Sequence, residues 1–544
     1  MTGVPASIIA QLVRDAQQDP ELPRANPTEA FWQLPPSPLS AHQSQDLPTK
    51  TTYAIIGSGI TACSVAKNLF ENLPSGSESH IIILEARTLC SGATGRNGGH
   101  LVSPFPEEFS IFEKYAGTEA TTKIARFANR TLESMHRLAE EGDGELRRVA
   151  EVRRVRSVCA YYDEGVFEET KKSIRRYEEC LPEEKGDGEF YGAEEARAVS
   201  LLFFPGVCGF EGKGRDVLMN VLQKWNFKDA VGVIVNRAGA CWPYRLVTGL
   251  FERMLEKYPG RFALETNTPV TGVEYDASAD QEYPYSVQTS RGVIRASKVI
   301  YCSNGFTGHL LPKMRGKIWP LRGTMSAQAA GPDFPNEGDT KSWSTFDQPK
   351  YDPKTGQFSY GLYYITQNAK TGDIFIGGEK QYPSEILNSD DTVISSVSKD
   401  ALVNVLPKIF DKGWPEGQAP ELRKCWSGIM GFTAQAVPFV GEIPESITVR
   451  PAGGEYIAAG FNGYGMPLCW GCGEAVAKML LGKKNEVMQW LPEDFLITDA
   501  RLSSPYSTTE AGIYTMLMQE PSLMTMARIG LKNIPSRLTG KVLG

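Results

Sequence analysis

The stretch Tyr53-Ala54-Ile55-Ile56-Gly57-Ser58-Gly59-Ile60-Thr61-Ala62 decides the fold of this chain. Its apolar start predicts a buried strand, and the residues after the two glycines continue as a helical pattern to Leu73. A second apolar run, Ile81-Ile82-Ile83-Leu84, follows and ends at Glu85. A strand, a glycine turn, a helix and a strand that ends at an acid predict a βαβ unit that binds a dinucleotide.

The residue types of this motif suit that ligand. Gly57 permits a tight turn, and Gly59 lets the backbone approach a pyrophosphate at the N-terminus of the following helix. Ala62 replaces the third glycine, which the fingerprint tolerates. Glu85 can accept hydrogen bonds from both ribose hydroxyls of an adenosine, and it would repel a 2′-phosphate. A glycine turn that binds no ligand is the alternative interpretation.

The next segment separates FAD from NAD. Ser91-Gly92-Ala93-Thr94-Gly95-Arg96-Asn97-Gly98-Gly99 contains two hydroxyls, one arginine, one asparagine and four glycines. Backbone amides of such a loop can surround a second, longer part of a cofactor. Because a plain NAD dehydrogenase has no evident use for this loop, the segment favours FAD.

Composition excludes several other classes of protein. The 544 residues carry 57 Lys and Arg against 64 Asp and Glu, a net charge of −7, which does not favour a nucleic-acid partner. No apolar run reaches the ~18 residues of a membrane span. Near the N-terminus, acidic residues and prolines occur before any apolar run long enough for the core of a signal peptide. The last four residues, Lys541-Val542-Leu543-Gly544, do not match a peroxisomal signal. We therefore expect a cytoplasmic protein without a membrane partner.

The ten cysteines do not form a pattern typical of a disulfide framework. The only CxxC is Cys469-Trp470-Gly471-Cys472, and no second CxxC or nearby histidine completes a zinc site. We expect no metal. Small buried residues of a helix are the favoured interpretation of this pair, and a redox role is the alternative.

Four groups of residues form a recognisable set: 55–62 with Glu85, 90–99, 299–305 followed by 319–323, and 426–433 with 438–441 and 459–466. The set resembles the D-amino-acid-oxidase-like family of FAD-dependent amine oxidoreductases, of the glycine oxidase and sarcosine oxidase type. The resemblance spans roughly residues 50–485 and is greatest to the γ-glutamylputrescine-oxidase-like branch.

The resemblance implies an α/β fold. A Rossmann-like FAD-binding domain is interleaved with an α+β substrate domain that carries a mainly antiparallel sheet. We assign 51–105, 230–312 and 420–484 to the FAD-binding domain and 106–229 and 313–419 to the substrate domain. Residues 1–50 and 485–544 are then N- and C-terminal extensions.

The motifs and the resemblance together predict FAD as the cofactor, and they imply that residues 460–466 pass the isoalloxazine ring. The predicted cofactor-binding residues are Gly57, Gly59, Ile60, Thr61, Glu85, Ala86, Arg87, Ser91, Gly92, Ala93, Thr94, Arg96, Asn97, Gly98, Gly99, His100, Val270, Ser303, Asn304, Gly305, Gly428, Gly431, Gly460, Phe461, Asn462, Gly463, Tyr464, Gly465 and Met466.

The sequence departs from the family at three positions. Gly428 stands where some members tether FAD through a cysteine, so we expect non-covalent FAD. Pro467 stands where those members hold a substrate carboxylate with a lysine, which disfavours a small N-methyl amino acid bound in the same way. Phe375 stands where the family has an oxygen-activating lysine, and Lys380 or Lys317 are the candidate substitutes.

The candidate catalytic residues are His100, Tyr360, Tyr364 and Lys380. His100 follows the glycine pair and could tune the flavin or contact substrate, although a loop histidine bonded to backbone is the alternative. Strand alternation places Tyr360 and Tyr364 on one face, either lining the active site or packing within the sheet.

The predicted function is FAD-dependent oxidation of a C–N bond in an amine or amino-acid-like small molecule. Hydride passes to flavin N5, and O₂ accepts the electrons. Placement of a neutral amine is the main demand on the side chains. The alternatives are a dehydrogenase or tailoring enzyme that does not use O₂, and a non-catalytic flavoprotein.

Overall fold

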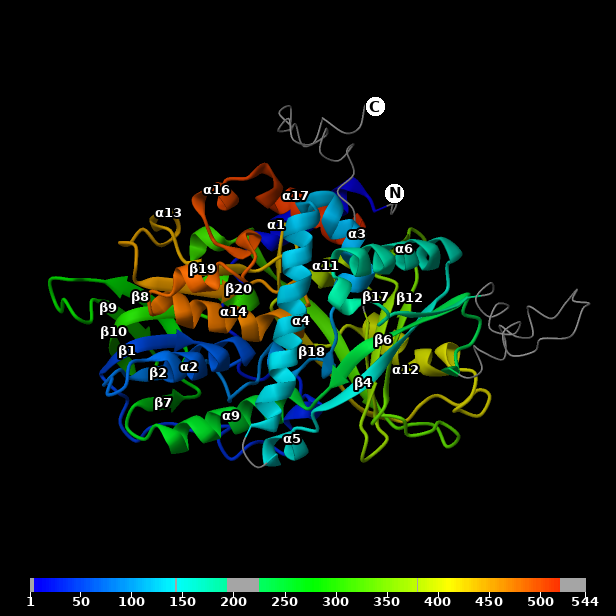
Figure 1. Ribbon diagram of the computed structural model, residues 1–544, viewed down its shortest axis with the longest axis horizontal. Coiled ribbons are helices and arrows are strands. Elements are labelled where there is room, and N and C mark those ends of the chain that lie inside the picture. Colours follow the sequence, from blue (N-terminus) through cyan, green and yellow to red (C-terminus); the bar gives the residue numbers. More distant parts are fainter. Residues whose placement is uncertain (1–3, 142–143, 193–224, 379, 519–544) are drawn as a thin grey trace, which may run out of the picture.

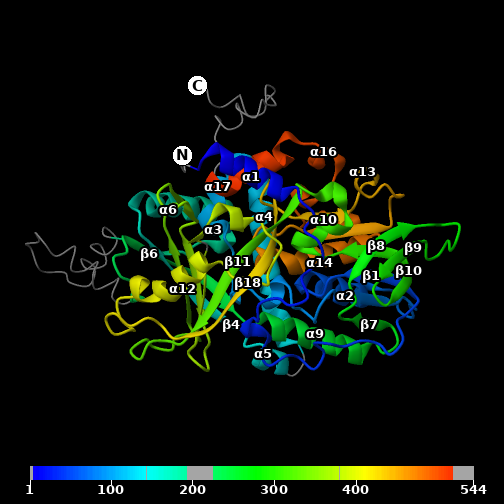
Figure 2. The same cartoon turned by 180° about the vertical axis from the view of Figure 1, so that it is seen from behind.

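The computed structural model describes residues 4–141, 144–192, 225–378 and 380–518. The chain forms two large sheets that lie side by side (Figures 1 and 2). Each sheet is built from segments that are far apart in the sequence. This arrangement confirms the predicted fold class, in which a nucleotide-binding unit is interleaved with an antiparallel one.

The first sheet has eight strands, and its core order is β19-β20-β10-β1-β2-β7. Strands β20, β10, β1, β2 and β7 run parallel, whereas β19 is antiparallel to β20, and β8 and β9 continue from β10 as antiparallel strands. The bounds are β1 Lys50–Ile56, β2 Ile81–Leu84, β7 Phe262–Glu265, β8 Val270–Tyr275, β9 Tyr285–Thr289, β10 Gly292–Tyr301, β19 Phe439–Glu442 and β20 Glu455–Ala459.

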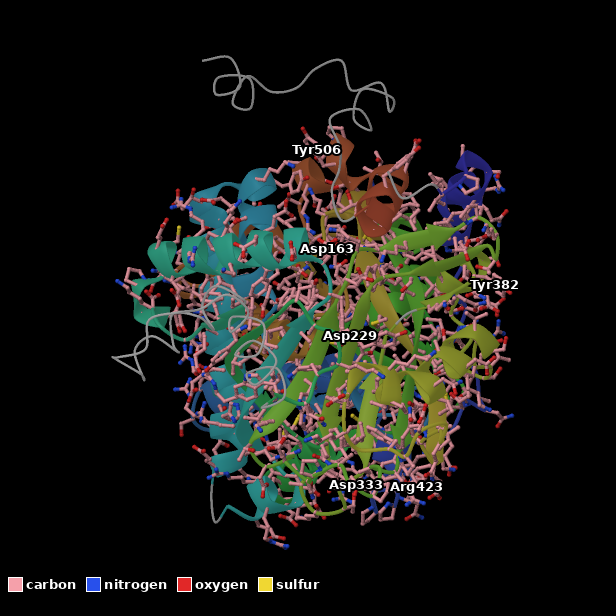
Figure 3. All side chains as sticks on the ribbon, turned by 90° about the vertical axis from the view of Figure 1, so that its right-hand side faces the viewer. Asp163, Asp229, Asp333, Tyr382, Arg423 and Tyr506 are labelled. Carbon is pink, nitrogen blue, oxygen red and sulfur yellow. The ribbon has the colours of Figure 1, made fainter. Side chains whose placement is uncertain are left out.

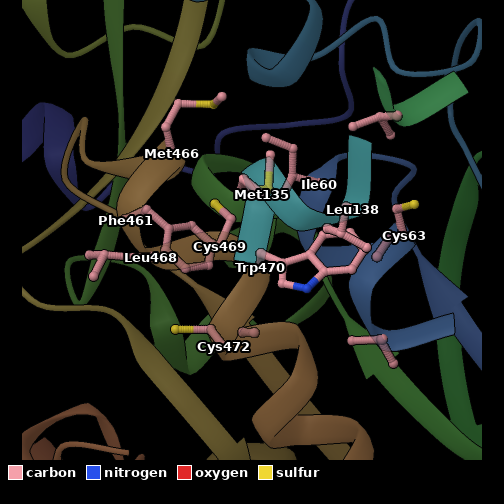
Figure 4. Packing of buried hydrophobic residues seen from close by; sticks show 14 of the residues in the cluster. Ile60, Cys63, Met135, Leu138, Phe461, Met466, Leu468, Cys469, Trp470 and Cys472 are labelled. Atoms are coloured by element: carbon pink, nitrogen blue, oxygen red, sulfur yellow. The ribbon is translucent and has the colours of Figure 1, made fainter. Parts of the chain in front are cut away.

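Two nearly all-buried helices, α2 (Ile60–Asn72) and α14 (Gly465–Leu480), pack against each other beside this sheet. They approach closely because small residues face each other: a Cβ at Gly473 would lie 2.7 Å from the Thr61 carbonyl oxygen. The Ser64 hydroxyl donates to the Trp470 carbonyl at 2.6 Å across this contact. The helix α4 (Thr118–Glu140) lies against α14 and contributes Met135 and Leu138 to the same core (Figure 4).

The second sheet has nine strands in the order β18-β11-β16-β15-β12-β4-β6-β3, with β5 on β6. Every pair in it is antiparallel except β12 with β4. The bounds are β3 His100–Leu101, β4 Arg153–Tyr161, β5 Glu189–Gly192, β6 Gly232–Ala240, β11 Ile318–Gln328, β12 Lys341–Phe346, β15 Leu362–Gln367, β16 Ile374–Gly377 and β18 Leu422–Thr433. A small third sheet joins β13 Lys350–Asp352, β14 Gln357–Ser359 and β17 Lys380–Gln381.

Helices beside the second sheet begin at side-chain caps. Asp163 (labelled in Figure 3) accepts from the Val166 amide at 2.9 Å and starts α6 (Glu164–Cys180). Ser395 likewise starts α12 (Ser396–Ile409), whose apolar face covers Trp343 and Ile365. Such caps satisfy amides that a helix leaves unpaired at its first turn.

Further helices and single turns connect these units. They are α3 Phe105–Ala116, α5 Glu145–Val149, α9 Pro243–Lys257, α10 Thr307–Leu310, α11 Pro383–Ile386, α13 Glu445–Thr448 and the single turns η2 Ala93–Gly95, η3 Pro182–Glu184, η4 Asn304–Phe306 and η5 Pro312–Met314. Within the described part of the chain, no helix combines the length and the apolar character that crossing a membrane requires.

The sheets divide the chain differently from the predicted boundaries. Residues 230–240 and 420–433, which the sequence assigned to the FAD-binding domain, supply β6 and β18 of the nine-stranded sheet. The reason is pairing: β6 pairs with β4 along nine residues, and β18 pairs with β11 along almost its whole length. Neither long-range pairing is visible in the local sequence.

Both terminal segments pack on the body. The N-terminal segment forms α1 (Ala6–Ala16) and η1 (Phe31–Gln33), and the C-terminal one forms α15 Lys484–Val487, η6 Glu493–Phe495, α16 Asp499–Leu502, η7 Pro505–Ser507 and α17 Thr509–Met518. Helices α1 and α17 contact each other and share a buried cluster (Figure 1). Leu491 and Phe495 are fully buried, so the C-terminal segment contributes to the main core. Residues 519–544 lie outside the described part.

Candidate functional site

A continuous cavity of 2490 Å³ is lined by residues from both large sheets. It reaches from the carboxyl ends of β1 and β2, at Ile56 and Leu84, to β4, β11, β12 and β15 of the second sheet. An ordinary ligand pocket measures ~300–1,000 Å³. This cavity therefore has room for a dinucleotide and a second molecule.

The glycine turn forms one end of the cavity. Gly57 has φ +107°, and a Cβ there would lie 2.7 Å from the Cys302 carbonyl oxygen. A Cβ on Gly59 would lie 2.9 Å from Thr94 Oγ1. Helix α2 follows Gly59, which has no capping side chain; the Ile60 amide donates to Thr94 Oγ1 at 3.1 Å, and the first residues of the helix line the cavity. A helix start beside a bare backbone turn suits a pyrophosphate.

Glu85 is held in place at the end of β2. Its Oε2 accepts from the Ser58 amide at 3.1 Å and the Ser58 hydroxyl at 2.6 Å, and its Oε1 accepts from the Arg87 amide at 2.9 Å. A carboxylate has about four acceptor positions. The three bonds fix the carboxylate at the cavity edge and leave acceptor capacity for a ribose hydroxyl.

The loop 91–99 is shaped by its own side chains. Asn97 donates to the Thr94 carbonyl at 3.0 Å and accepts from the Gly99 amide at 2.7 Å. Arg96 donates to the carbonyls of Ser91 at 2.7 Å and Ser427 at 2.8 Å. These two side chains therefore hold the loop itself. Ser91 Oγ is buried without a hydrogen-bond partner among the described residues, but Ser91 is not a lining residue of the cavity.

Arg87 lines the cavity, but its guanidinium makes a structural ion pair. Its NH1 donates to both carboxylate oxygens of Asp391 at 3.0 Å and to the Arg24 carbonyl at 3.1 Å. Arg96 Nε lies 3.8 Å from the same carboxylate, and burial lowers the pKa of Arg96 to about 10. The buried cluster joins the cofactor loop to the segment after α11 and to the N-terminal segment.

The opposite wall of the cofactor region is the loop that precedes α14. Asn304 Oδ1 accepts from the Gly460 amide at 3.0 Å, and Asn462 donates to the Gly460 carbonyl at 2.7 Å. Gly460 and Gly463 both have φ +82°, which favours glycine. Helix α14 starts at Gly465 without a side-chain cap and faces the cavity with Gly465 and Met466. Such a helix start stabilises negative charge on a bound ring.

The structure brings most of the predicted cofactor residues to one cavity. All of them line it except Ser91, Gly99, Gly305, Gly431 and Gly460, which lie behind the lining. Gly305 and Gly431 have a packing role instead, because a Cβ on Gly431 would lie 2.4 Å from Asn304 Oδ1.

Three of the four candidate catalytic residues, His100, Tyr360 and Tyr364, line the cavity. His100 Nε2 lies 2.8 Å from Ser342 Oγ, and burial lowers its pKa to about 4, so its ring is neutral near pH 7. A Cβ on Gly98 would lie 3.0 Å from the Tyr364 ring, which places this tyrosine directly against the glycine pair.

The candidate lysines lie elsewhere. Lys380, on β17, is not a lining residue, and Lys317 donates to the carbonyls of Leu502 at 2.8 Å and Ser507 at 3.0 Å. Phe375 stacks on Trp32 with ring centroids 4.0 Å apart, also outside the cavity lining. Neither lysine therefore lines the cavity.

Sequence reasoning missed two carboxylates in the first turn of α3. Glu107 and Glu108 line the cavity. Tyr464 donates to Glu108 Oε1 at 2.8 Å, and Asn236 donates to Glu107 Oε1 at 2.7 Å. Burial raises the pKa of Glu107 to about 8 and that of Glu108 to about 7. Acids in a first helical turn are common, so the sequence carried no signal of this role.

The N-terminal segment also belongs to the site. Glu21, Leu22 and Pro23 line the cavity. Thr28 Oγ1 accepts from the Ser427 amide at 2.9 Å, and Gln33 donates to the Gly95 carbonyl at 3.2 Å. The segment predicted as an extension therefore covers the cofactor loop.

The surroundings of the CxxC pair do not favour thiolates. Cys469 and Cys472 are free and buried, and burial raises the pKa of Cys469 to about 12, which opposes thiolate formation. Among the described residues, no group of three or more potential ligands could hold a metal ion.

A dinucleotide-binding βαβ unit that shares one large cavity with an antiparallel sheet defines the architecture of a flavin-dependent oxidoreductase. Comparison with known families agrees: the model described as "DAO: FAD dependent oxidoreductase" matches residues 52–479. The chain belongs to this family of FAD-dependent enzymes. FAD is its cofactor, and the geometry of the glycine turn, Glu85 and the two helix starts fits it.

The chain is similar to two curated relatives. It is 21% identical over 474 residues to "Probable oxidoreductase OrdL" of Rhizobium meliloti (strain 1021), covering 84% of this chain and 91% of the relative. It is 22% identical over 470 residues to "Gamma-glutamylputrescine oxidoreductase" of Escherichia coli (strain K12), covering 85% of this chain and 91% of the relative.

Solved structures show the same fold. Glycine oxidase from Geobacillus kaustophilus superposes with a TM-score of 0.56 at 16% identity, covering 83% of this chain and 99% of that one. L-proline dehydrogenase from P. horikoshii superposes with a TM-score of 0.55 at 19% identity, covering 82% and 97%.

Proposed function

We propose that the protein oxidises a C–N bond of an amine or amino-acid-like small molecule, with O₂ as the electron acceptor. The observation that carries this proposal is the single cavity, in which the FAD-binding turn, the α14 start and a wall of tyrosines and carboxylates meet. Relatives named for γ-glutamylputrescine and glycine, each similar over more than four-fifths of this chain, support a nitrogen-containing substrate.

FAD, when bound, supplies the acceptor for a hydride from the carbon next to the substrate nitrogen. Gly57, Gly59 and the α2 start would hold the pyrophosphate, and Glu85 would hold a ribose. The α14 start would stabilise negative charge on the ring. Tyr364 and Tyr360 would bound the substrate space.

A dehydrogenase or tailoring activity that does not use O₂ is the second candidate. Phe375 replaces the oxygen-activating lysine of the family and packs on Trp32. Of the described lysines, only Lys114 and Lys172 line the cavity, and both are exposed. The interior wall therefore offers no described lysine beside the flavin position.

Peroxide release under air separates the two candidates. Purified holoenzyme is given a panel of primary and secondary amines and amino acids, and hydrogen peroxide is measured together with loss of substrate. We expect one peroxide for each molecule of substrate oxidised. Turnover that requires an artificial electron acceptor and yields no peroxide would favour the second candidate.

Precipitation with trichloroacetic acid tests the mode of FAD attachment. We expect the yellow colour to stay in the supernatant, because Gly428 offers no thiol and a Cβ there would already lie 3.2 Å from Arg96 Cβ. Cys425 is the nearest thiol along the strand, and burial raises its pKa to about 11. A yellow pellet would contradict non-covalent binding.

A further inference from the structure

One wall of the cavity is acidic and polar, and the oxidation of a C–N bond does not by itself give its carboxylates a role. It is formed by Glu107 and Glu108 at the start of α3 and Tyr161 at the end of β4, and we refer to these three residues as the carboxylate wall. Glu108 is joined to the cofactor region directly, because Tyr464 precedes α14 and donates to both its carboxylate oxygens, at 2.8 and 3.0 Å.

Two polar groups of the carboxylate wall have unused bonding capacity. Tyr161 is only 1% exposed, lines the cavity, and its hydroxyl has no hydrogen-bond partner in the described structure. Glu107 accepts from Asn236 through Oε1, but its buried Oε2 has no partner there either. Buried polar groups are almost always hydrogen-bonded, so two orphans on one cavity wall indicate a ligand with several donors.

The cavity lining offers few cationic side chains that could neutralise a substrate carboxylate at this wall. Among the lining residues that the structure describes, Arg87 and Arg96 are bound to Asp391 and to backbone carbonyls. Arg501 donates to the carbonyls of Pro438 at 2.7 Å and Val437 at 2.9 Å. The two lining lysines are exposed at the rim. A carboxylate at the wall would therefore meet two acidic side chains and no available buried cation.

We propose that the carboxylate wall binds the substrate nitrogen as an ammonium group and accepts the proton that this nitrogen must lose before hydride transfer, and that the enzyme therefore takes amines that carry no carboxylate in preference to amino acids. An ammonium group has three donors and no acceptor, which matches the two carboxyls and the unpartnered hydroxyl. This inference rests on the proposed function, because it describes the substrate of the same reaction.

The pH dependence of binding follows from the same residues. The titratable groups near the wall are Tyr464 before α14, Cys159 on β4 and Asp187 before β5, and Glu169 and Lys172 of α6, the helix that packs on α3, line the same cavity. A cation binds the ionised carboxyls, so affinity should rise as pH increases through about 7 for Glu108 and about 8 for Glu107. A simple alkylamine stays protonated throughout, since its pKa is near that of lysine, ~10.4.

Calorimetric titration of the holoenzyme without oxygen tests the inference. The probes are n-butylamine and γ-aminobutyrate, which differ by one carboxylate. The variants are Glu107→Gln and Glu108→Gln, which keep an acceptor oxygen for Asn236 and Tyr464. The matched control is Glu169→Gln, an exposed carboxylate of α6 that also lines the cavity. The ratio of FAD to protein in each variant reports correct folding.

We expect the wild type to bind n-butylamine about tenfold or more tightly than γ-aminobutyrate, and each wall variant to lose about tenfold in affinity for n-butylamine. Glu169→Gln should bind as the wild type does. The inference is overturned if the wall variants bind n-butylamine unchanged, if γ-aminobutyrate binds equally well, or if the wild type binds no amine.

The flavin absorption, recorded in the same titrations, separates this inference from the proposed function. If amines bind as expected and no compound reduces the flavin, the wall is confirmed and the proposed oxidation fails. If amines reduce the flavin and the wall variants bind them unchanged, the oxidation stands and the carboxylate wall is wrong.

Discussion

The Gly57→Ala variant is expected to purify with almost no FAD. Gly57 has φ +107°, where an L-residue is strained by ~1–2 kcal/mol. Its new Cβ would also lie 2.7 Å from the Cys302 carbonyl oxygen, a backbone atom of the strand end that cannot move alone. Strain and collision together should displace the turn and weaken FAD binding by about 100-fold. The measurement is the ratio of flavin to protein absorbance after dialysis.

Gly76→Ala is the matched control for this prediction. Gly76 also has a positive φ, +80°, but a Cβ there would meet nothing within 4 Å. This variant therefore carries comparable backbone strain without the collision, and it should retain the full amount of FAD. If Gly57→Ala holds FAD as firmly as Gly76→Ala does, the glycine turn is not in contact with the cofactor.

The Asp391→Asn variant should be strongly destabilised. Asp391 is 1% exposed and is the carboxylate that pairs with Arg87 and neighbours Arg96. Removing its charge leaves two buried guanidinium groups uncompensated, which costs about 3–5 kcal/mol in the free energy of unfolding. The thermal midpoint of the holoprotein should fall clearly, and FAD should dissociate more readily because both arginines border its loop.

Asp280→Asn provides the comparison. Asp280 pairs with Lys50 at 2.8 Å, but the lysine side chain is 57% exposed and water already screens the pair. Its thermal midpoint should stay close to that of the wild type. Equal midpoints for Asp391→Asn and Asp280→Asn would show that the buried cluster is not needed to balance the two arginines.

The cofactor site could be predicted from the sequence because its determinants are local. Gly57, Gly59, the α2 start and Glu85 lie within thirty residues, and each acts mainly through the backbone or through one short contact. Strand, turn and helix are encoded by the order of apolar and small residues. Residues 460–466 could be predicted for the same reason, because their glycines indicate the turn before α14.

The substrate wall could not be predicted because its contacts are long-range. Glu108 and Tyr464 are 356 positions apart, and Arg87 and Asp391 are 304 apart. Arg87 lines the cavity and remains a predicted cofactor residue, but its ion pair with Asp391 arises only in the folded chain. Lys380 shows the opposite case. It is close in sequence to the strand that carries the oxygen-activating lysine in the family, but in the structure it lies on β17, which pairs in the separate small sheet.

Anaerobic mixing of the purified holoprotein with the amine panel tests the central claim most directly. FAD-dependent oxidation of a C–N bond predicts that at least one amine bleaches the visible flavin absorption in a single turnover, and that the colour returns when air is admitted. If light reduces the flavin but no amine or amino acid in the panel does, the protein does not oxidise the C–N bond of such molecules.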